Sequence, residues 1–283
     1  ASGHADDDVV IDHGGSVGTR RMMDVATSAK LWQILGTGFD HFDLEYIRRL
    51  GIPVANCPGG FSSGALAESA MMFILMLSRR YQQSADNFES GVLYQPLSFE
   101  LSGQSLGIIG LGASGEELAR RAKSFGMKIL AIDVRTIESQ VLDELQPEFM
   151  GSPLDIDQII TEVDFLSLHL HLNSETRHII DARRISLMKS TACLINVARG
   201  ELVDEQALHY ALVNRKLGGA GLDVFTEEPP DPQAPVFQLP NVVITPHVAG
   251  VTYQTSRQRA ACAAQNVDRI AQELSPFYRI DEN

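Results

Sequence analysis

Short apolar runs alternate with amphipathic stretches along most of the chain. From Gly103 onward the apolar runs are continuous, and we expect strands at 106–109, 128–132, 165–170, 192–197, 219–224 and 242–245. Continuous runs are typical of parallel strands that helices cover on both faces. Helical spacing separates them, as at Leu118, Ala119 and Ala122. This alternation predicts a doubly wound α/β domain with a parallel sheet.

The first hundred residues show the same alternation on a smaller scale. Strands are expected near Val9, Trp32 and Pro53, and a helix over 43–50 that ends at Gly51. Two long helices are expected as well, over 65–80 and 253–274. We therefore assign residues 96–249 to a dinucleotide-type domain, and residues 1–95 together with 250–283 to a second, smaller α/β domain.

A glycine-rich segment follows the first strand of the larger domain. It reads Gly110-Leu111-Gly112-Ala113-Ser114-Gly115 and opens a helix. In this context the glycines allow a tight turn, close approach of a diphosphate and close packing of helix on strand. Asp133 ends the next strand, where a carboxylate can bind ribose hydroxyls, which favours NAD over NADP despite the nearby Arg135.

Three later strands end in side chains that suit acid–base chemistry. Asn196-Val197-Ala198-Arg199-Gly200 supplies an arginine, which can bind a carboxylate with two hydrogen bonds. The segment 221–229 supplies Asp223 and Glu228, and Thr245-Pro246-His247 supplies a histidine. A carboxylate stabilises the charged form of a neighbouring histidine, which can then donate a proton to an oxygen.

Composition and charge narrow the function classes. The chain has 283 residues with 36 acidic and 23 basic side chains, a net charge of -13 that disfavours nucleic acid and membrane surfaces as partners. The longest apolar stretch, 65–77, carries Glu68 and is too short to cross a bilayer. Cys57, Cys193 and Cys262 lie far apart, which suits a reducing cytoplasm.

Two further patterns favour structural interpretations. His169 and His171 share a strand face, but no third ligand stands at suitable spacing, so we expect no metal site. The apolar helix that contains Met71, Phe73 and Leu77 is interpreted as buried core or as a dimer contact, and its position favours a dimer seam.

Taken together, these motifs resemble the D-2-hydroxyacid dehydrogenase family. The resemblance is carried by Gly36-Thr37-Gly38-Phe39-Asp40, Asn56-Cys57-Pro58-Gly59, Gly110 to Gly115, Asp133, Asn196 to Gly200, Leu222 to Phe225 with Glu227-Glu228-Pro229, and Thr245-Pro246-His247. It implies a two-domain NAD(H)-dependent oxidoreductase, usually a homodimer, with a Rossmann-type cofactor domain, a smaller flavodoxin-like substrate domain and an active site between them. Its relatives carry a further strand and helix before the segment that matches Val9, so we expect the substrate domain to lack its first strand and helix.

The resemblance also implies roles for single residues. Arg199, Glu228 and His247 are expected to be catalytic, and the substrate is expected to bind to Gly36, Thr37, Gly38, Arg199 and His247. The residues expected to bind NAD are Gly110, Gly112, Ala113, Ser114, Gly115, Asp133, Leu170, Thr176, Val197, Ala198 and Asp223. Ser114 replaces a common apolar residue of the family and His171 a common proline, both near the expected cofactor path.

The expected substrate is a small 2-ketoacid or D-2-hydroxyacid with an uncharged tail, such as glyoxylate, hydroxypyruvate or pyruvate. Loops 36–38 and 56–64 contain no basic cluster, which disfavours a phosphorylated substrate. Formate dehydrogenases lack the acid that Glu228 supplies, and phosphite dehydrogenases carry a lysine in place of Thr37. Two alternatives are a non-catalytic dimer that senses NAD(H), similar to transcriptional corepressors of this superfamily, and an inactive fragment.

Overall fold

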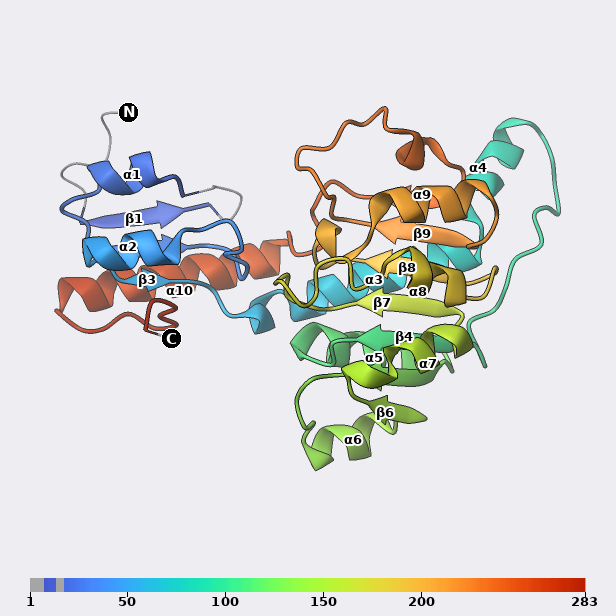
Figure 1. Cartoon of the computed structure of the whole chain (residues 1–283), viewed down its shortest axis with the longest axis horizontal. Helices are drawn as coiled ribbons and strands as arrows, with labels where there is room; N and C mark the ends of the chain where they lie inside the picture. Colours follow the sequence, from blue (N-terminus) through green and yellow to red (C-terminus); the bar gives the residue numbers. More distant parts are fainter. Residues whose placement is uncertain (1–7, 14–17, 283) are drawn as a thin grey trace. The chain divides into compact units, whose positions relative to one another are not determined.

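The computed structural model describes residues 8–13 and 18–282, and these form two compact units. The first unit combines the two ends of the chain, up to Phe61 and from Val251 onward. The second unit is the continuous segment Ser62–Gly250. Both have parallel sheets with helices, as the sequence predicts (Figure 1).

The first unit is a small sheet flanked by helices. Its described residues form three parallel strands in the order β1-β2-β3. Its elements are β1 (Val9–Asp12), α1 (Arg20–Val25), β2 (Leu31–Ile34), α2 (Leu44–Leu50), β3 (Val54–Ala55), the 3-10 helix η1 (Gly59–Phe61) and α10 (Tyr253–Ala271). Trp32 fills the core and donates its indole N–H to Asp12 over 3.0 Å. Gly51 ends α2 with a φ of 72°, which glycine adopts without strain.

The C-terminal segment completes this unit. Arg279 forms an antiparallel bridge with Ala55, and the carboxylate of Asp281 accepts the backbone N–H of Val54 at 2.9 Å. On α10, Asn266 is fully buried and donates to the side chain of Gln33 on β2 at 2.6 Å. The return of the C-terminal helix to the first domain is therefore seen in the structure.

The second unit is a doubly wound parallel sheet. Its described residues form seven strands in the order β10-β9-β8-β7-β4-β5-β6. Its elements are α3 (Ser63–Ser78), α4 (Tyr81–Glu89), β4 (Ser105–Ile109), α5 (Ala113–Ser124), β5 (Lys128–Ile132), α6 (Ser139–Leu145), β6 (Phe149–Gly151), η2 (Pro153–Asp155), α7 (Ile156–Glu162), β7 (Phe165–Leu168), α8 (Ala182–Leu187), β8 (Cys193–Asn196), η3 (Gly200–Leu202), α9 (Glu205–Val213), β9 (Gly219–Leu222), η4 (Pro235–Gln238) and β10 (Val242–Ile244). All six expected strands are present, and β6 is an edge strand that the pattern did not reveal.

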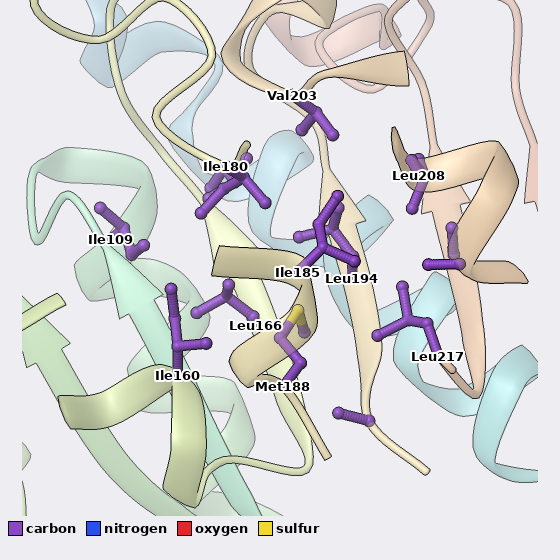
Figure 2. Close-up of a cluster of buried hydrophobic side chains, with 14 of the residues drawn as sticks. Ile109, Ile160, Leu166, Ile180, Ile185, Met188, Leu194, Val203, Leu208 and Leu217 are labelled. Atoms are coloured by element: carbon purple, nitrogen blue, oxygen red, sulfur yellow. The ribbon is translucent and has the colours of Figure 1, made fainter. Parts of the chain in front are cut away.

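Separate apolar layers cover the two faces of this sheet. One layer joins α7, α8 and α9 to the strands, and Figure 2 shows Ile160, Leu166, Ile185 and Leu194 within it. The other layer joins α3 and α5 to the opposite face. Chain order reverses between β4 and β7, and ligands of such sheets bind at the carboxyl ends of the strands at this point.

Helix α3 corrects the domain boundary expected near residue 95. From the sequence we place 62–95 in the first domain, whereas the structure places it in the second unit. The cause is packing: Phe73 is fully buried, and its ring lies so close to Gly221 on β9 that a Cβ there would be 2.6 Å away. Phe73 and its neighbour Ile74 are therefore core of their own unit.

Candidate active site

The glycine-rich turn lies at the reversal point between β4 and β7. Gly110 has a φ of 97°, and a Cβ there would lie 2.4 Å from the carbonyl oxygen of His169. A Cβ at Gly115 would lie 2.2 Å from the carbonyl oxygen of Gly110. Only glycine fits either position, so α5 begins close against β4 with the amides of its first turn available. This cradle fits the diphosphate of a dinucleotide.

Asp133 lies at the end of β5 beside this turn and is almost fully buried. Its carboxylate accepts the backbone N–H of Leu111 at 2.8 Å and the backbone N–H of Arg135 at 2.8 Å. The guanidinium of Arg135 donates to both carboxylate oxygens, at 3.0 and 3.1 Å. Burial alone raises the pKa of Asp133, but the bonds and charge of Arg135 outweigh it and lower the pKa overall. Asp133, the expected ribose-binding acid, is thus ionised and paired with Arg135.

The acids that open α5 pair with arginines one helical turn later. Glu117 pairs with both Arg120 and Arg121, and Glu116 pairs with Arg120 at 3.3 Å. The bond to Arg121 lowers the pKa of Glu117. These pairs compensate the two negative charges next to the expected phosphate position.

Ser114 and His169 join the start of α5 to the end of β7. The Oγ of Ser114 lies 2.9 Å from Nδ1 of His169, and the Oγ of Ser167 lies 3.0 Å from Nε2. Burial lowers the pKa of His169 to about 4, so the ring is neutral and one of its nitrogens donates while the other accepts. Both nitrogens are already used, and the described residues contain no group of three potential metal ligands.

The remaining expected cofactor residues lie on neighbouring strand ends. Leu170 follows β7 and lies against Gly110. Thr176 donates its hydroxyl to the carbonyl of His171 at 2.7 Å within the exposed loop after β7. Val197 and Ala198 follow β8, where the side chain of Asn196 bonds the backbone of Ala198 and Arg199 and fixes the turn.

Asp223 is buried at the end of β9 and holds the next strand end in place. It accepts hydrogen bonds from the hydroxyl of Thr245 at 2.5 Å and from the backbone N–H groups of Val248 and Ala249 at 2.8 Å. These bonds surround His247, whose backbone has a φ of 55°. Such backbone strain persists only where neighbouring contacts impose it.

His247 and Glu228 form a hydrogen-bonded pair at the carboxyl edge of the sheet. Nδ1 of His247 lies 2.8 Å from Oε2 of Glu228, and Oε1 accepts the backbone N–H of Phe225 at 3.1 Å. The side chains are 48% and 39% exposed. With Nδ1 committed to the carboxylate, Nε2 is the atom that can give a proton to a bound molecule.

Arg199 belongs to the same edge through close packing of two loops. A Cβ at Gly200 would lie 1.9 Å from the carbonyl carbon of Phe225, so the loop after β8 touches the loop that carries Glu228. Arg199 is partly buried and donates to the carbonyl of Ala198 at 2.7 Å. The structure thus gathers the three expected catalytic residues onto adjacent strand ends of one unit.

The expected substrate loop lies in the first unit. The side chain of Asn56 donates to the carbonyl of Thr37 at 2.8 Å, and the backbone N–H of Cys57 donates to the carbonyl of Gly36 at 3.0 Å. The hydroxyl oxygen of Thr37 is buried without a partner in the described chain. Sequence reasoning missed Arg259, a partly buried arginine of α10, because it lies some two hundred residues away from this loop in the sequence.

Comparison with known proteins assigns the family. A family model described as "D-isomer specific 2-hydroxyacid dehydrogenase, NAD binding domain" matches residues 71–249. The chain is 38% identical over 256 residues to a glyoxylate reductase of Thermococcus onnurineus, covering 87% of this chain and 74% of that one. It is 35% identical over 271 residues to a hydroxypyruvate reductase of Thermotoga maritima, covering 94% and 85%.

A third curated relative is longer. This is a D-3-phosphoglycerate dehydrogenase of Methanocaldococcus jannaschii, 36% identical over 267 residues, which cover 94% of this chain and 50% of the relative. The chain therefore spans about half the length of that protein.

Solved structures agree with these relatives. A D-lactate dehydrogenase of Aquifex aeolicus in complex with NAD and lactic acid superposes with a TM-score of 0.85 at 31% identity, covering 95% of this chain and 84% of that one. The TT0316 protein of Thermus thermophilus gives a TM-score of 0.85 at 33% identity, covering 95% and 85%. The chain therefore belongs to the D-isomer specific 2-hydroxyacid dehydrogenase family and carries its NAD-binding domain.

Proposed function

We propose that the chain reduces a small 2-ketoacid to the D-2-hydroxyacid with NADH, in the manner of the glyoxylate and hydroxypyruvate reductases that it resembles. The observation that carries this proposal is the His247–Glu228 pair, with Nδ1 2.8 Å from the carboxylate and Nε2 left for a substrate. A carbonyl that accepts hydride needs a proton on its oxygen, and this pair supplies one. An intact acid–base pair favours turnover over the alternative of non-catalytic NAD(H) sensing.

Each unit has its own task in this proposal. The second unit holds NAD(H) with the Gly110–Gly115 turn and Asp133, and the bound nicotinamide supplies the hydride. The first unit binds the substrate carboxylate with the backbone amides of Gly36 to Gly38, since successive amides form a suitable concavity for a small anion. Arg199 binds and polarises the substrate carbonyl, and His247 protonates its oxygen.

The test compares His247→Gln and Glu228→Gln with the wild type. NADH oxidation is followed with glyoxylate, hydroxypyruvate and pyruvate. We expect kcat to fall by about a hundredfold or more in His247→Gln and by about tenfold in Glu228→Gln, while the Kd of NADH changes by less than about twofold. Wild-type protein that binds NADH but reduces none of the three acids would instead identify a sensor.

We also propose that the protein is a cytoplasmic homodimer. An apolar segment in and after α4 supports the dimer, since Phe88, Leu93, Tyr94 and Leu97 are between 68% and 96% exposed, and patches of this kind mark association surfaces. Its three cysteines are buried free thiols, which suits a reducing compartment. No helix in the described residues is both long and apolar enough to cross a membrane. Sedimentation of the wild type and of Leu97→Glu tests the dimer, which the substitution should dissociate.

A further inference from the structure

The backbone of Gly36 to Gly38, which is expected to bind the substrate carboxylate, is called the substrate cradle. One face of α10 covers the loop that is hydrogen-bonded to this cradle. Thr255, Arg259, Cys262 and Asn266 follow the spacing of a single helical face. Thr255 donates its hydroxyl to the carbonyl of Phe61 at 3.2 Å, and Asn266 bonds Gln33 on β2. Helix α10 therefore packs along β2 and η1 within the first unit.

Arg259 occupies the middle of this face, between Thr255 and Cys262. Its guanidinium interacts electrostatically with Cys57, which also contacts Cys262 one turn further along α10. The backbone of Cys57 is bonded to Gly36, and the preceding residue Asn56 is bonded to Thr37. The charge of Arg259 therefore lies next to the segment that holds the cradle, whose own loops, 36–38 and 56–64, contain no basic residue.

This charge has no counter-ion in the described part of the chain. Nε of Arg259 is buried without a hydrogen-bond partner, and no carboxylate among the described residues pairs with the guanidinium. Burial raises the pKa of Cys57 to about 12, so its thiol is neutral and cannot serve as the anion. The other members of the helix face, Thr255, Cys262 and Asn266, are neutral as well.

A partly buried arginine whose Nε has no hydrogen-bond partner among the described residues is costly to desolvate. Partial burial lowers the pKa of Arg259, although the arginine remains protonated at neutral pH. The chain has 36 acidic side chains, yet none of those described compensates it. Uncompensated charges of this kind are typical of ligand sites, where the ligand supplies the partner.

We propose that Arg259 binds a negatively charged tail of the substrate, so that the preferred 2-ketoacid carries a second carboxylate or a phosphate. The inference rests on the proposed reduction of a 2-ketoacid and refines its substrate class, replacing the uncharged tail expected from the loop sequences. The guanidinium suits either anion, since it donates two parallel hydrogen bonds to a carboxylate or a phosphate. The unpartnered hydroxyl of Thr37 offers a further polar contact in the same loop.

The kinetic test uses three substrates that share one 2-ketoacid head. Oxaloacetate carries a terminal carboxylate, 3-phosphohydroxypyruvate a phosphate, and 4-methyl-2-oxopentanoate an isopropyl group of similar shape to the carboxylate. In Arg259→Met we expect kcat/KM to fall by about tenfold to a hundredfold for the preferred anionic substrate, and by less than about twofold for 4-methyl-2-oxopentanoate. The exposed Arg257 of the same helix gives the control, and Arg257→Met should change neither value. Arg259→Lys should restore part of the loss, since it keeps the charge without the planar fork.

The outcomes separate the inference from the proposed function. An equal loss for all three substrates in Arg259→Met would place the arginine on the common carboxylate or in the fold and would overturn the inference. If the wild type reduces all three substrates and Arg259→Met changes kcat/KM for none of them, the inference is overturned. The proposed function would stand in that case. If Arg259→Met lowers kcat/KM more for oxaloacetate than for 3-phosphohydroxypyruvate, Arg259 binds a carboxylate tail. The opposite order identifies a phosphate tail.

Binding measured without turnover gives an independent readout. Calorimetry with D-malate and with D-2-hydroxy-4-methylpentanoate in the presence of NADH forms complexes that cannot react. We expect Arg259→Met to weaken D-malate by at least about tenfold and to leave the uncharged acid unchanged. This result in a protein that reduces no 2-ketoacid would reject the proposed function and keep the anion site, whereas D-malate binding that is undetectable or independent of Arg259 overturns the inference.

Discussion

Arg135 engages both carboxylate oxygens of Asp133, which are the atoms that ribose hydroxyls need. The guanidinium is anchored further by the carbonyl of Leu111 at 3.0 Å, while its side chain remains 59% exposed. A ribose bound at Asp133, as expected from the sequence, would have to displace these charge-assisted bonds. A 2'-phosphate would be attracted by the charge of Arg135 and repelled by that of Asp133. The two side chains therefore have opposite effects on the choice between NAD and NADP.

Removal of Arg135 is predicted to sharpen the preference for NADH. In Arg135→Ala we expect the Kd of NADH to fall by about threefold to tenfold, because Asp133 is released, and the Kd of NADPH to rise by at least as much. Fluorescence titration of each nucleotide measures both. Arg183→Ala, an exposed arginine of the same unit that pairs with Asp157, is the control and should change neither. Weaker NADH binding in Arg135→Ala would show that Arg135 is a cofactor ligand and not a competitor.

Single residues show where the sequence was informative and where it was not. The strand ends predicted a histidine and an acid at one sheet edge, and the family resemblance singled out Glu228 as the partner of His247. Arg259 could not be predicted, because only the packing of α10 on η1 brings it to the cradle. The bonds of Asp223 to Val248 and Ala249 also depend on backbone geometry that no pattern reveals.

At the scale of elements, the contact of α3 with β9 depends on the presence of a glycine, Gly221, at the point of contact. Gly221 leaves room for the ring of Phe73, and a Cβ there would lie 2.6 Å from two of its carbons. Gly60, in η1, gives a matched comparison, because a Cβ at that position would meet nothing within 4 Å beyond its chain neighbours.

Gly221→Ala is predicted to destabilise the second unit. We expect its free energy of unfolding to fall by about 1 to 3 kcal/mol, because the added methyl group must push α3 away from the sheet. Urea denaturation monitored by circular dichroism measures this, and Gly60→Ala should change stability by less than about 0.5 kcal/mol. Equal stability of the two variants would mean that α3 is not seated on β9 as described.

His169, which joins the start of α5 to the end of β7, should make the stability of the protein depend on pH. The pKa of His169 is about 4 in the folded protein and near 6.5 in an unfolded chain, so the unfolded chain binds more protons between these values. The contribution of His169 is therefore complete above about pH 6.5 and is lost as the pH falls toward 4, by at most about 1.4 kcal/mol per pH unit.

Substitution of this histidine should flatten that dependence. The midpoint of urea unfolding is compared between pH 7 and pH 4.5 for the wild type, for His169→Gln and for the control His41→Gln, whose histidine is exposed. We expect His169→Gln to lose less stability over this range than the other two proteins. A parallel decline in all three would exclude His169 as a source of the pH dependence.

Elements differ in how far their patterns could identify them. Six of the seven strands of the second unit were recognised because each reads as a continuous apolar run, including β10, an edge strand in which only Val242 is buried. Strand β6 was missed because its three residues are only partly buried, as suits a sheet edge. Helix α3 was recognised but assigned to the wrong domain, since an apolar helix does not specify which sheet it covers.

At the scale of the whole molecule, the two units should respond differently to the cofactor. NADH at a hundredfold excess over its Kd should stabilise the second unit by about 2.7 kcal/mol, because it binds only the folded state. Hydrogen exchange followed by mass spectrometry should show slower exchange in β4, α5 and β5. Peptides of β1 and α1 should change little, and equal protection of both units would contradict a cofactor site confined to the second.

The split composition of the first unit sets the order in which the molecule can fold during synthesis. Residues 62–250 are continuous and can collapse as soon as they leave the ribosome, whereas the sheet around β2 waits for the segment from Val251 onward. Before the Asn266–Gln33 and Asp281–Val54 hydrogen bonds form, the strands of the first unit stay exposed, although the second unit has already folded. Loss of Asp281 and its neighbours would therefore destabilise the first unit and leave the second unit folded.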